Sequence, residues 1–286
     1  MLANLKDLVV PAADNPCSVA CFSIFGWEDA CAVVEAATQM DAPLIFGVGA
    51  DFRRTMPLEV ISTMLRRLAA DAPVPICVHL DHCYDLSEVR RAVDAGFTSV
   101  MYDGSQLPLA DNIAGTRQIA EYAHAAGCSV EGEIGSVPYA EGRAHIKSEL
   151  SSATDAARLA RESGLDALAI SVGNVHRLSA PGARVDFDLL HRIESSVSVP
   201  LVIHGTSGLY DADIVRLTRT RVAKFNIGTV LRQAFGSSLR ETLQRHPHRF
   251  DRLEIMSDVM PAVTREARRM IGLLGWPLEG AVRHQA

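Results

Sequence analysis

An apolar run that begins at Pro75 ends in an imidazole, a carboxylate and a second imidazole. These groups belong to His79, Asp81 and His82. Side chains alternate along a strand, so His79 and Asp81 share one face, whereas His82 falls where the strand gives way to a loop. Such groups could bind a metal or move a proton at the mouth of a fold. Alternatively, they could form the water-facing end of an ordinary core strand.

Other apolar runs end in groups of the same kind, which favours the chemical interpretation. Three are histidines from separate runs, His82, His176 and His204, and a catalytic zinc ion uses about three protein ligands with one position left open. A single histidine would more often be a hydrogen-bonded structural residue, but three at equivalent strand ends favour a metal site. The groups on the third to the eighth run are Asp81, His82, Asp103, Glu131, Glu133, His176, His204 and Asn226.

A metal at this position would act as a Lewis acid on a carbonyl group. Asp81 is adjacent to a predicted ligand, where it could exchange a proton with a substrate hydroxyl or, alternatively, orient a histidine. Two glycine-bearing segments, His204–Gly208 and Asn226–Thr229, follow the last two runs. Barrels often bind phosphate there through backbone N–H groups and a helix N-terminus, so these segments indicate a phosphate or another anion.

These groups need a scaffold that collects several strand ends at one rim. Eight apolar runs alternate with helical patterns, as in a parallel sheet covered on both faces, and predict an α/β fold, a (β/α)8 TIM barrel. Residues from about Thr229 to Trp276 are predicted to be helical with an interruption at Pro261, and the C-terminal helical extension, about 235–286, could cap the barrel or pack against a second subunit. We expect a single domain over residues 1–286. The eight runs are Val19–Phe25, Pro43–Val48, Pro75–Cys83, Ser99–Gly104, Ser129–Ile134, Ala167–Val172, Pro200–His204 and Val222–Ile227.

The composition narrows the class of partner. Hydrophobic residues make up 48% of the 286 residues and charged residues 22%, as in globular proteins with a sizeable core. The formal net charge of −6 and the lack of a basic run argue against a nucleic-acid partner. The six cysteines form no CxxC pair and no N-terminal signal pattern occurs, which predicts a cytoplasmic location. The apolar runs are far shorter than the roughly 20 residues of a membrane span.

Several motifs resemble those of the class II, metal-dependent ketose-bisphosphate aldolases, the fructose- and tagatose-bisphosphate group. The resemblance runs from about Ser18 to Gly228. The most specific segments are 79–82 (HLDH), 98–108 (TSVMYDGSQLP), 129–135 (SVEGEIG), 204–208 (HGTSG) and 226–229 (NIGT).

The resemblance implies a metal set. A zinc ion would be held by His82, His176 and His204. Glu133 matches a carboxylate near an alternative metal position, and Asp103 matches one associated with the same region. A monovalent cation near the phosphate is a further expectation from the family.

The resemblance also implies catalytic roles. Asp81 matches the acid/base that acts on the C4 hydroxyl in the cleavage direction, and Asn226 would hold the enediolate. Glu141, by its spacing from Glu133, matches the loop glutamate that moves the proton on the nucleophilic carbon. The residues that match the binding positions for the phosphate of dihydroxyacetone phosphate are Gly205, Ser207 and Thr229.

Departures from the family pattern concern substrate recognition. The usual Gly-Gly before the loop glutamate is replaced by Pro138–Ala140. Arg177 replaces the glycine that usually follows the histidine, where it could block the approach of phosphate or offer a charged fork to a carboxylate or phosphate. Ser23 replaces an asparagine near the first run and is kept as a candidate substrate contact. The usual distal-phosphate arginine has no clear counterpart.

The main hypothesis is a zinc-dependent aldolase that reversibly cleaves a phosphorylated ketose, such as fructose or tagatose bisphosphate, into dihydroxyacetone phosphate and an aldehyde. A second hypothesis keeps the carbon–carbon lyase chemistry but changes the substrate to a non-bisphosphorylated sugar or a keto acid. A non-catalytic metal-binding protein and a metal-assisted hydrolase are the alternatives from other classes. A homodimer or homotetramer is expected.

Overall fold

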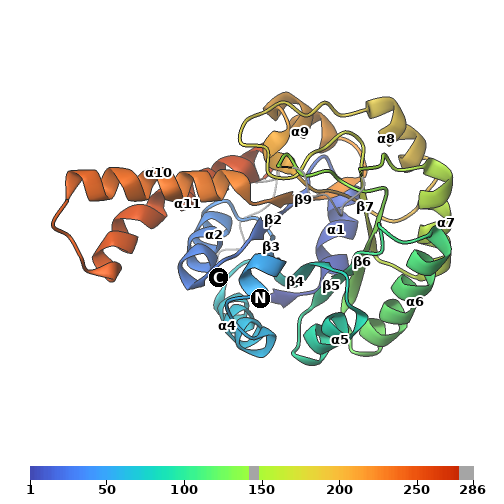
Figure 1. The fold of residues 1–286 in the computed structure, drawn as a ribbon, viewed down its shortest axis with the longest axis horizontal. Helices are drawn as coiled ribbons and strands as arrows, with labels where there is room; N and C mark the ends of the chain where they lie inside the picture. The colour runs from blue at the N-terminus through green and yellow to red at the C-terminus, as the bar shows by residue number, and fades with distance from the viewer. Residues whose placement is uncertain (142–147, 277–286) are drawn as a thin grey trace.

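Runs of buried aliphatic residues form a closed barrel of eight parallel strands (Figure 1). The computed structural model describes residues 1–141 and 148–276. Each barrel strand pairs in parallel with both neighbours, and the pairing of β4 with β5 closes the ring. The predicted (β/α)8 barrel is therefore confirmed. Its strands are β2 (Val19–Ser23), β3 (Leu44–Val48), β4 (Ile76–Cys83), β5 (Ser99–Tyr102), β6 (Ser129–Ile134), β7 (Ala167–Ile170), β8 (Leu201–Ile203) and β9 (Val222–Ile227).

Helices between the strands surround the barrel and bury their apolar faces against it (Figure 1). Local signals set their ends. The side chain of Asp85 accepts a hydrogen bond from the backbone of Ser87 at the start of α5, and Gly164, with a φ of 77°, ends α7. The helices are α2 (Trp27–Gln39), α3 (Ala50–Arg53), α4 (Leu58–Asp71), α5 (Leu86–Asp94), α6 (Leu109–Ala125), α7 (Ala153–Ser163), α8 (Phe187–Glu194) and α9 (Asp211–Leu217), with a 3-10 turn η1 (Thr206–Gly208).

The N-terminal residues close the barrel end opposite the polar strand ends. A short strand β1 (Leu2–Ala3) pairs with β4, and helix α1 (Leu5–Ala13) follows it. The buried face of α1 shares a cluster with inward-facing side chains of the strands, such as Ile45 and Met101. This plug leaves the C-terminal rim as the open end, where active sites of this architecture lie.

The C-terminal helices form a hairpin that projects from the barrel (Figure 1). Helix α10 (Thr229–Arg245) starts directly after β9, where the helical stretch was expected to begin, and α11 (Arg252–Leu273) packs along α10 and α2. The expected interruption at Pro261 is wrong, because α11 continues through it. The packing of α11 along two helices can offset the loss of the one backbone hydrogen bond that a proline removes. Among the described residues, no helix combines the length and hydropathy that a membrane span requires.

Candidate metal centre and active site

Three histidines converge at the open rim. His82 lies inside β4 rather than after it. The pairing of β4 with β5 shifts register between Leu80 and Cys83, and His82 adopts a φ of 44° within this irregular part of the strand. His176 lies in the segment after β7, and His204 follows β8 directly. One ring nitrogen from each histidine lies within 4.8 Å of the others. The structure thus brings together the three side chains that the sequence singled out.

The other polar contacts of the rings fix which nitrogen carries the proton. His204 Nε2 lies 2.9 Å from Glu131 Oε1, and His82 Nδ1 lies 2.8 Å from Asp103 Oδ2. Since a carboxylate only accepts, each ring donates there and turns the lone pair of its second nitrogen inward. These two inward nitrogens, His82 Nε2 and His204 Nδ1, are 2.8 Å apart. Two acceptors at this distance need a shared proton or a cation.

His176 completes the donor set. Its Nε2 is buried and has no hydrogen-bond partner among the described residues. Burial, followed by the positive charge of His82, places the pKa of both His176 and His204 well below the usual value, so both rings are neutral, as metal ligands must be. Three imidazole nitrogens that converge in this way fit a divalent metal such as zinc.

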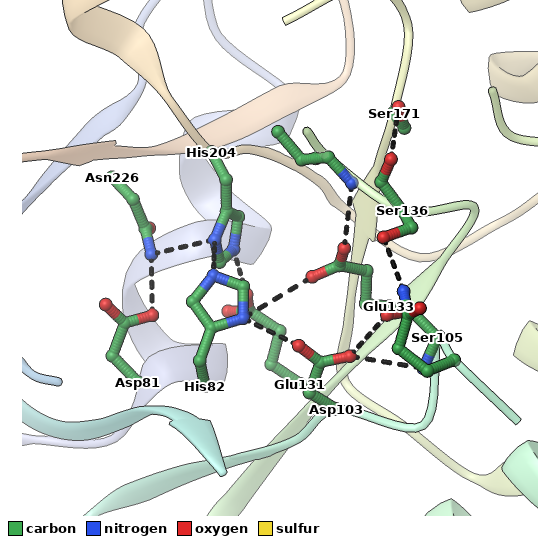
Figure 2. Close-up of polar contacts among 12 residues, drawn as sticks. Asp81, His82, Asp103, Ser105, Glu131, Glu133, Ser136, Ser171, His204 and Asn226 are labelled. Carbon is green, nitrogen blue, oxygen red and sulfur yellow. Dashed lines mark hydrogen bonds and ion pairs between the residues drawn. The ribbon is translucent and has the colours of Figure 1, made fainter. Parts of the chain in front are cut away.

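A second group of donors lies on the other side of the His82 ring (Figure 2). Donor atoms of His82, Asp103 and Glu133 lie within 4.8 Å of one another. Glu133 Oε2 is buried, has no hydrogen-bond partner among the described residues and lies 3.7 Å from His82 Nδ1. Burial, followed by the negative charge of Asp103, raises the pKa of Glu133 well above its usual value. These three residues, one imidazole and two buried carboxylates, form a candidate for the expected alternative metal position.

A fully buried ion pair in the barrel interior contacts His204 through Glu131. Lys224 Nζ contacts Glu131 Oε2 inside the barrel, and both side chains are 0% exposed. Lys224 Nζ also lies 3.1 Å from His79 Nε2, and His79 Nδ1 lies 2.8 Å from Ser99 Oγ. His79 thus lies in the barrel interior and is not part of either group of candidate metal ligands among the described residues. Through Glu131, this pair holds the ring of His204 in one tautomer and one orientation.

Asp81 and Asn226 stand together beside the histidines (Figure 2). The Nδ2 of Asn226 donates to Asp81 Oδ1 at 2.9 Å and lies 3.3 Å from His204 Nδ1. Burial raises the pKa of Asp81, but the positive charge of His82, together with the nearby His204 ring and the Lys224 ammonium, outweighs it, and the pKa lies below the usual value. Asp81 is therefore an ionised carboxylate with a fixed orientation, able to accept a proton from a group beside the metal.

The remaining expected binding residues line one cavity with a volume of about 150 Å³. The helix N-terminus of α10 opens into it, and Gly228 at the cap makes no side-chain capping bond, which leaves backbone N–H groups for an anion. Gly205 adopts a φ of 70° there, and a Cβ would lie 2.4 Å from the backbone oxygen of Val175. The expected substrate residues among the lining side chains are Ser23, Arg177, Gly205, Ser207 and Thr229.

The structure does not bring Glu141 into this cavity. Glu141 is exposed in a turn and is not among the lining residues. Tyr139, two residues earlier, lines the cavity instead and stacks on His176 with ring centroids 4.6 Å apart. Backbone bonds between 138–140 and His176 fix this contact: His176 N donates to Pro138 O at 2.7 Å, and Ala140 N donates to His176 O at 2.9 Å.

Sequence reasoning missed several cavity residues. Their signals were present in part: Asp51 and Arg54 follow the glycine that ends the second apolar run, a position equivalent to that of the predicted site residues. Tyr139 lies in the segment that departs from the family pattern. The missed lining residues with polar or aromatic side chains are Phe25, Asp51, Arg54, Tyr84, Tyr139 and Arg232.

A protein family and a known protein match this chain over most of its length. The family described as "Fructose-bisphosphate aldolase class-II" matches residues 3–276. A protein named sulfofructosephosphate aldolase from Alkalicoccus urumqiensis is 33% identical over 248 residues, which cover 86% of this chain and 86% of that protein.

Solved structures share the fold over nearly the whole chain. The YdjI aldolase from Escherichia coli K12 superposes with a TM-score of 0.83 at 29% identity, covering 96% of this chain and 98% of the other. The structure titled a putative fructose-1,6-biphosphate aldolase from Coccidioides immitis has a TM-score of 0.84 at 22% identity, covering 95% and 96%.

Proposed function

The chain belongs to the class II fructose-bisphosphate aldolase family and is an aldolase, and from this premise we propose that it reversibly cleaves a phosphorylated ketose into dihydroxyacetone phosphate and an aldehyde. The family is metal-dependent, and we propose zinc as the ion. The observation that carries the proposal is the convergence of three imidazole nitrogens beside the Asp81–Asn226 pair. A bound divalent ion supplies Lewis-acid polarisation of the ketone carbonyl.

The residues of the chain supply the remaining steps. The ionised Asp81 takes the proton from the C4 hydroxyl of the ketose as the carbon–carbon bond breaks. In the reverse direction it returns this proton. Asn226 orients Asp81 and offers its amide to the oxygen atoms of the ketone fragment. His204 is kept in its ligating orientation by Glu131 and Lys224.

Substrate binding is proposed to start at the phosphate. The backbone N–H groups at the start of α10 and the side chains of Ser207 and Thr229 would hold the phosphate of the ketone fragment. Glu141 remains our candidate for moving the proton on the nucleophilic carbon, and from its exposed position its carboxylate would have to approach the cavity to do so.

The name of the relative from Alkalicoccus urumqiensis supports a second candidate substrate, a ketose phosphate that carries a sulfonate. The arginine side chains in the cavity favour it as well as they favour a bisphosphate. We also propose a homo-oligomer, for which the exposure of Phe250 (93%) and Leu253 (77%) at the tip of the helical hairpin is the support. Light scattering coupled to size-exclusion chromatography measures the subunit number.

A cleavage screen tests the proposed function. Purified enzyme is incubated with fructose and tagatose bisphosphates, their 1-phosphates and a sulfonated ketose phosphate, and dihydroxyacetone phosphate is detected by coupled NADH oxidation. We expect saturable release from at least one of them. Absence of release from every ketose phosphate, with zinc bound, would contradict the proposal.

A further inference from the structure

The backbone of β4 is irregular at the point where it carries two of the site residues. From Leu80 to Cys83, three steps along β4 match only two steps along β5, so β4 contains one extra residue, a β-bulge. His82 lies in this bulge and adopts a φ of 44°, a left-handed conformation that is uncommon for a residue with a side chain. Such a backbone persists only where the surrounding structure holds it.

The bulge directs two neighbouring side chains to the same site. In a regular strand, the side chains of Asp81 and His82 would point to opposite faces. Instead, Asp81 accepts a hydrogen bond from Asn226, and His82 Nε2 lies 2.8 Å from His204 Nδ1. Figure 2 shows both side chains directed at one centre. The geometry of the site therefore depends on the shape of this bulge.

A buried guanidinium binds the backbone of the bulge. Arg53 is the last residue of α3, and its side chain is only 7% exposed. Its Nη1 donates to Asp81 O at 2.9 Å, and its Nη2 donates to His82 O at 3.1 Å. Nη1 also donates to the backbone oxygen of Val48, the last residue of β3, at 2.9 Å. One side chain thus connects the end of β3 to both carbonyl groups of the bulge.

The guanidinium is fixed in turn by the first turn of α5. Arg53 Nε donates to Glu88 Oε1 at 2.9 Å. The other carboxylate oxygen, Glu88 Oε2, accepts from Cys83 Sγ at 3.2 Å, directly after the bulge. A planar guanidinium has donors in fixed directions and can serve three carbonyl oxygens and a carboxylate at once, whereas a lysine ammonium is a compact point charge. This set of contacts therefore requires an arginine.

Arg53 differs in position from the arginines that face the cavity. The described residues that line the cavity include Arg54 but not Arg53. The donors of Arg53 are used on the backbone and on Glu88, behind the side chains of Asp81 and His82. Arg53 can therefore influence the chemistry only through the residues that it holds.

We propose that Arg53 is a positioning residue, which sets the backbone of the bulge so that the carboxylate of Asp81 and the imidazole of His82 reach the same centre. It contacts neither the substrate nor the metal and acts through these two residues. The inference rests on the proposed function for the role of Asp81. The role of His82 is tested by metal binding alone.

The first test measures metal binding without turnover. Arg53→Met keeps a long side chain but removes every donor, and we expect zinc affinity to fall about 10- to 100-fold. The visible absorption spectrum of bound Co²⁺ reports the ligand geometry and should change as well. Circular dichroism selects the conditions under which the variant is folded, so that a loss of stability alone moves neither readout. Arg67→Ala, which breaks an exposed ion pair on α4, is the control and should match the wild type.

The outcome of this test is decisive with either of two variants. A folded Arg53→Met with the wild-type zinc affinity and Co²⁺ spectrum overturns the proposal. Arg53→Lys keeps the charge beside Glu88 but cannot reach all three carbonyl oxygens, so we expect a smaller loss of affinity in the same direction. If Arg53→Met does not fold, wild-type affinity and spectrum in Arg53→Lys overturn the proposal in its place.

The second test separates kcat from KM in the zinc-saturated enzyme. Arg53→Met should lower kcat about 10- to 100-fold and change KM little, because the residues that line the cavity are intact. In the Asp81→Ala background the same substitution should lower kcat less, since the carboxylate that it positions is gone. Equal fold losses in both backgrounds, or a change in KM alone, overturn the inference. If no ketose phosphate is cleaved, the proposed function fails, whereas the Co²⁺ spectra still decide whether Arg53 shapes the centre.

Discussion

His82 Nε2 and His204 Nδ1 face each other at 2.8 Å, although each ring already donates its proton elsewhere, to Asp103 and to Glu131. This relationship defines the centre, because two lone pairs at this separation are stable only around a shared proton or a cation. His176 adds a third inward nitrogen. The predictions below follow from this arrangement and from the groups that maintain it.

Replacing Glu131 by Gln should weaken metal binding about 10- to 100-fold, because the partner that orients His204 loses its charge. It also leaves Lys224 as an uncompensated buried charge, which should cost about 3–5 kcal/mol of stability. The double variant Glu131→Gln with Lys224→Met separates the two effects: it should recover much of the stability and still bind metal weakly. Metal competition titrations and chemical unfolding measure both quantities, and unchanged metal affinity in Glu131→Gln would refute the orienting role.

Asp81→Ala should keep the metal and lose turnover. The carboxylate contacts Asn226 and is not among the three inward imidazoles, so zinc content should stay at the wild-type level. Loss of a general acid/base typically lowers kcat by about 10²- to 10⁴-fold. Zinc analysis and steady-state kinetics on the same preparation provide the check. A variant that turns over normally would remove Asp81 from the proton transfer.

Metal binding should release protons and weaken in acid. Burial disfavours the charged form of His82, but its hydrogen bond to Asp103 and the nearby carboxylates raise its pKa well above the usual value. At neutral pH this ring is protonated before the metal binds, and the proton must leave from Nε2. Affinity should therefore rise with pH up to that raised pKa. Calorimetry in buffers of different ionisation enthalpy counts the protons released, and a count of zero would disagree with this protonation state.

Gly205→Ala should destabilise the protein by at least about 1–2 kcal/mol, since a side chain is disfavoured at a φ of 70° and its Cβ would approach the backbone of Val175. Gly182→Ala is the matched control, because a Cβ there meets no atom within 4 Å and the φ lies outside the left-handed region. Thermal unfolding of both variants compares them. Equal stabilities would show that the tight turn after β8 adapts without cost.

Much of the site follows from sequence because the ends of parallel strands meet at one rim. Polar residues at the ends of apolar runs, such as His204 and Asn226, therefore predict a common site without any knowledge of distances. The closing of one barrel end by helix α1 was not predicted, because the apolar face of α1 resembles that of any amphipathic surface helix. The register shift at His82 also lay beyond sequence reasoning, since a bulge depends on pairing with the neighbouring strand.

Contacts between residues far apart in the sequence could not be predicted either. Arg177 stood out by its position after His176, but its partner Asp51 is 126 residues away in sequence, and nothing local links the two. Likewise, the continuation of α11 through Pro261 depends on packing against α2 and α10, which local propensity does not contain. Glu141 was assigned by spacing alone, and the structure places it in an exposed turn.

The most direct test of the account is the metal dependence of cleavage. Enzyme dialysed against EDTA and shown by elemental analysis to be metal-free should cleave no ketose phosphate, and one equivalent of zinc per chain should restore the full rate. His176→Ala should bind zinc weakly and stay inactive under the same conditions. Undiminished cleavage by the metal-free enzyme would contradict the central claim that three converging histidines hold the catalytic ion.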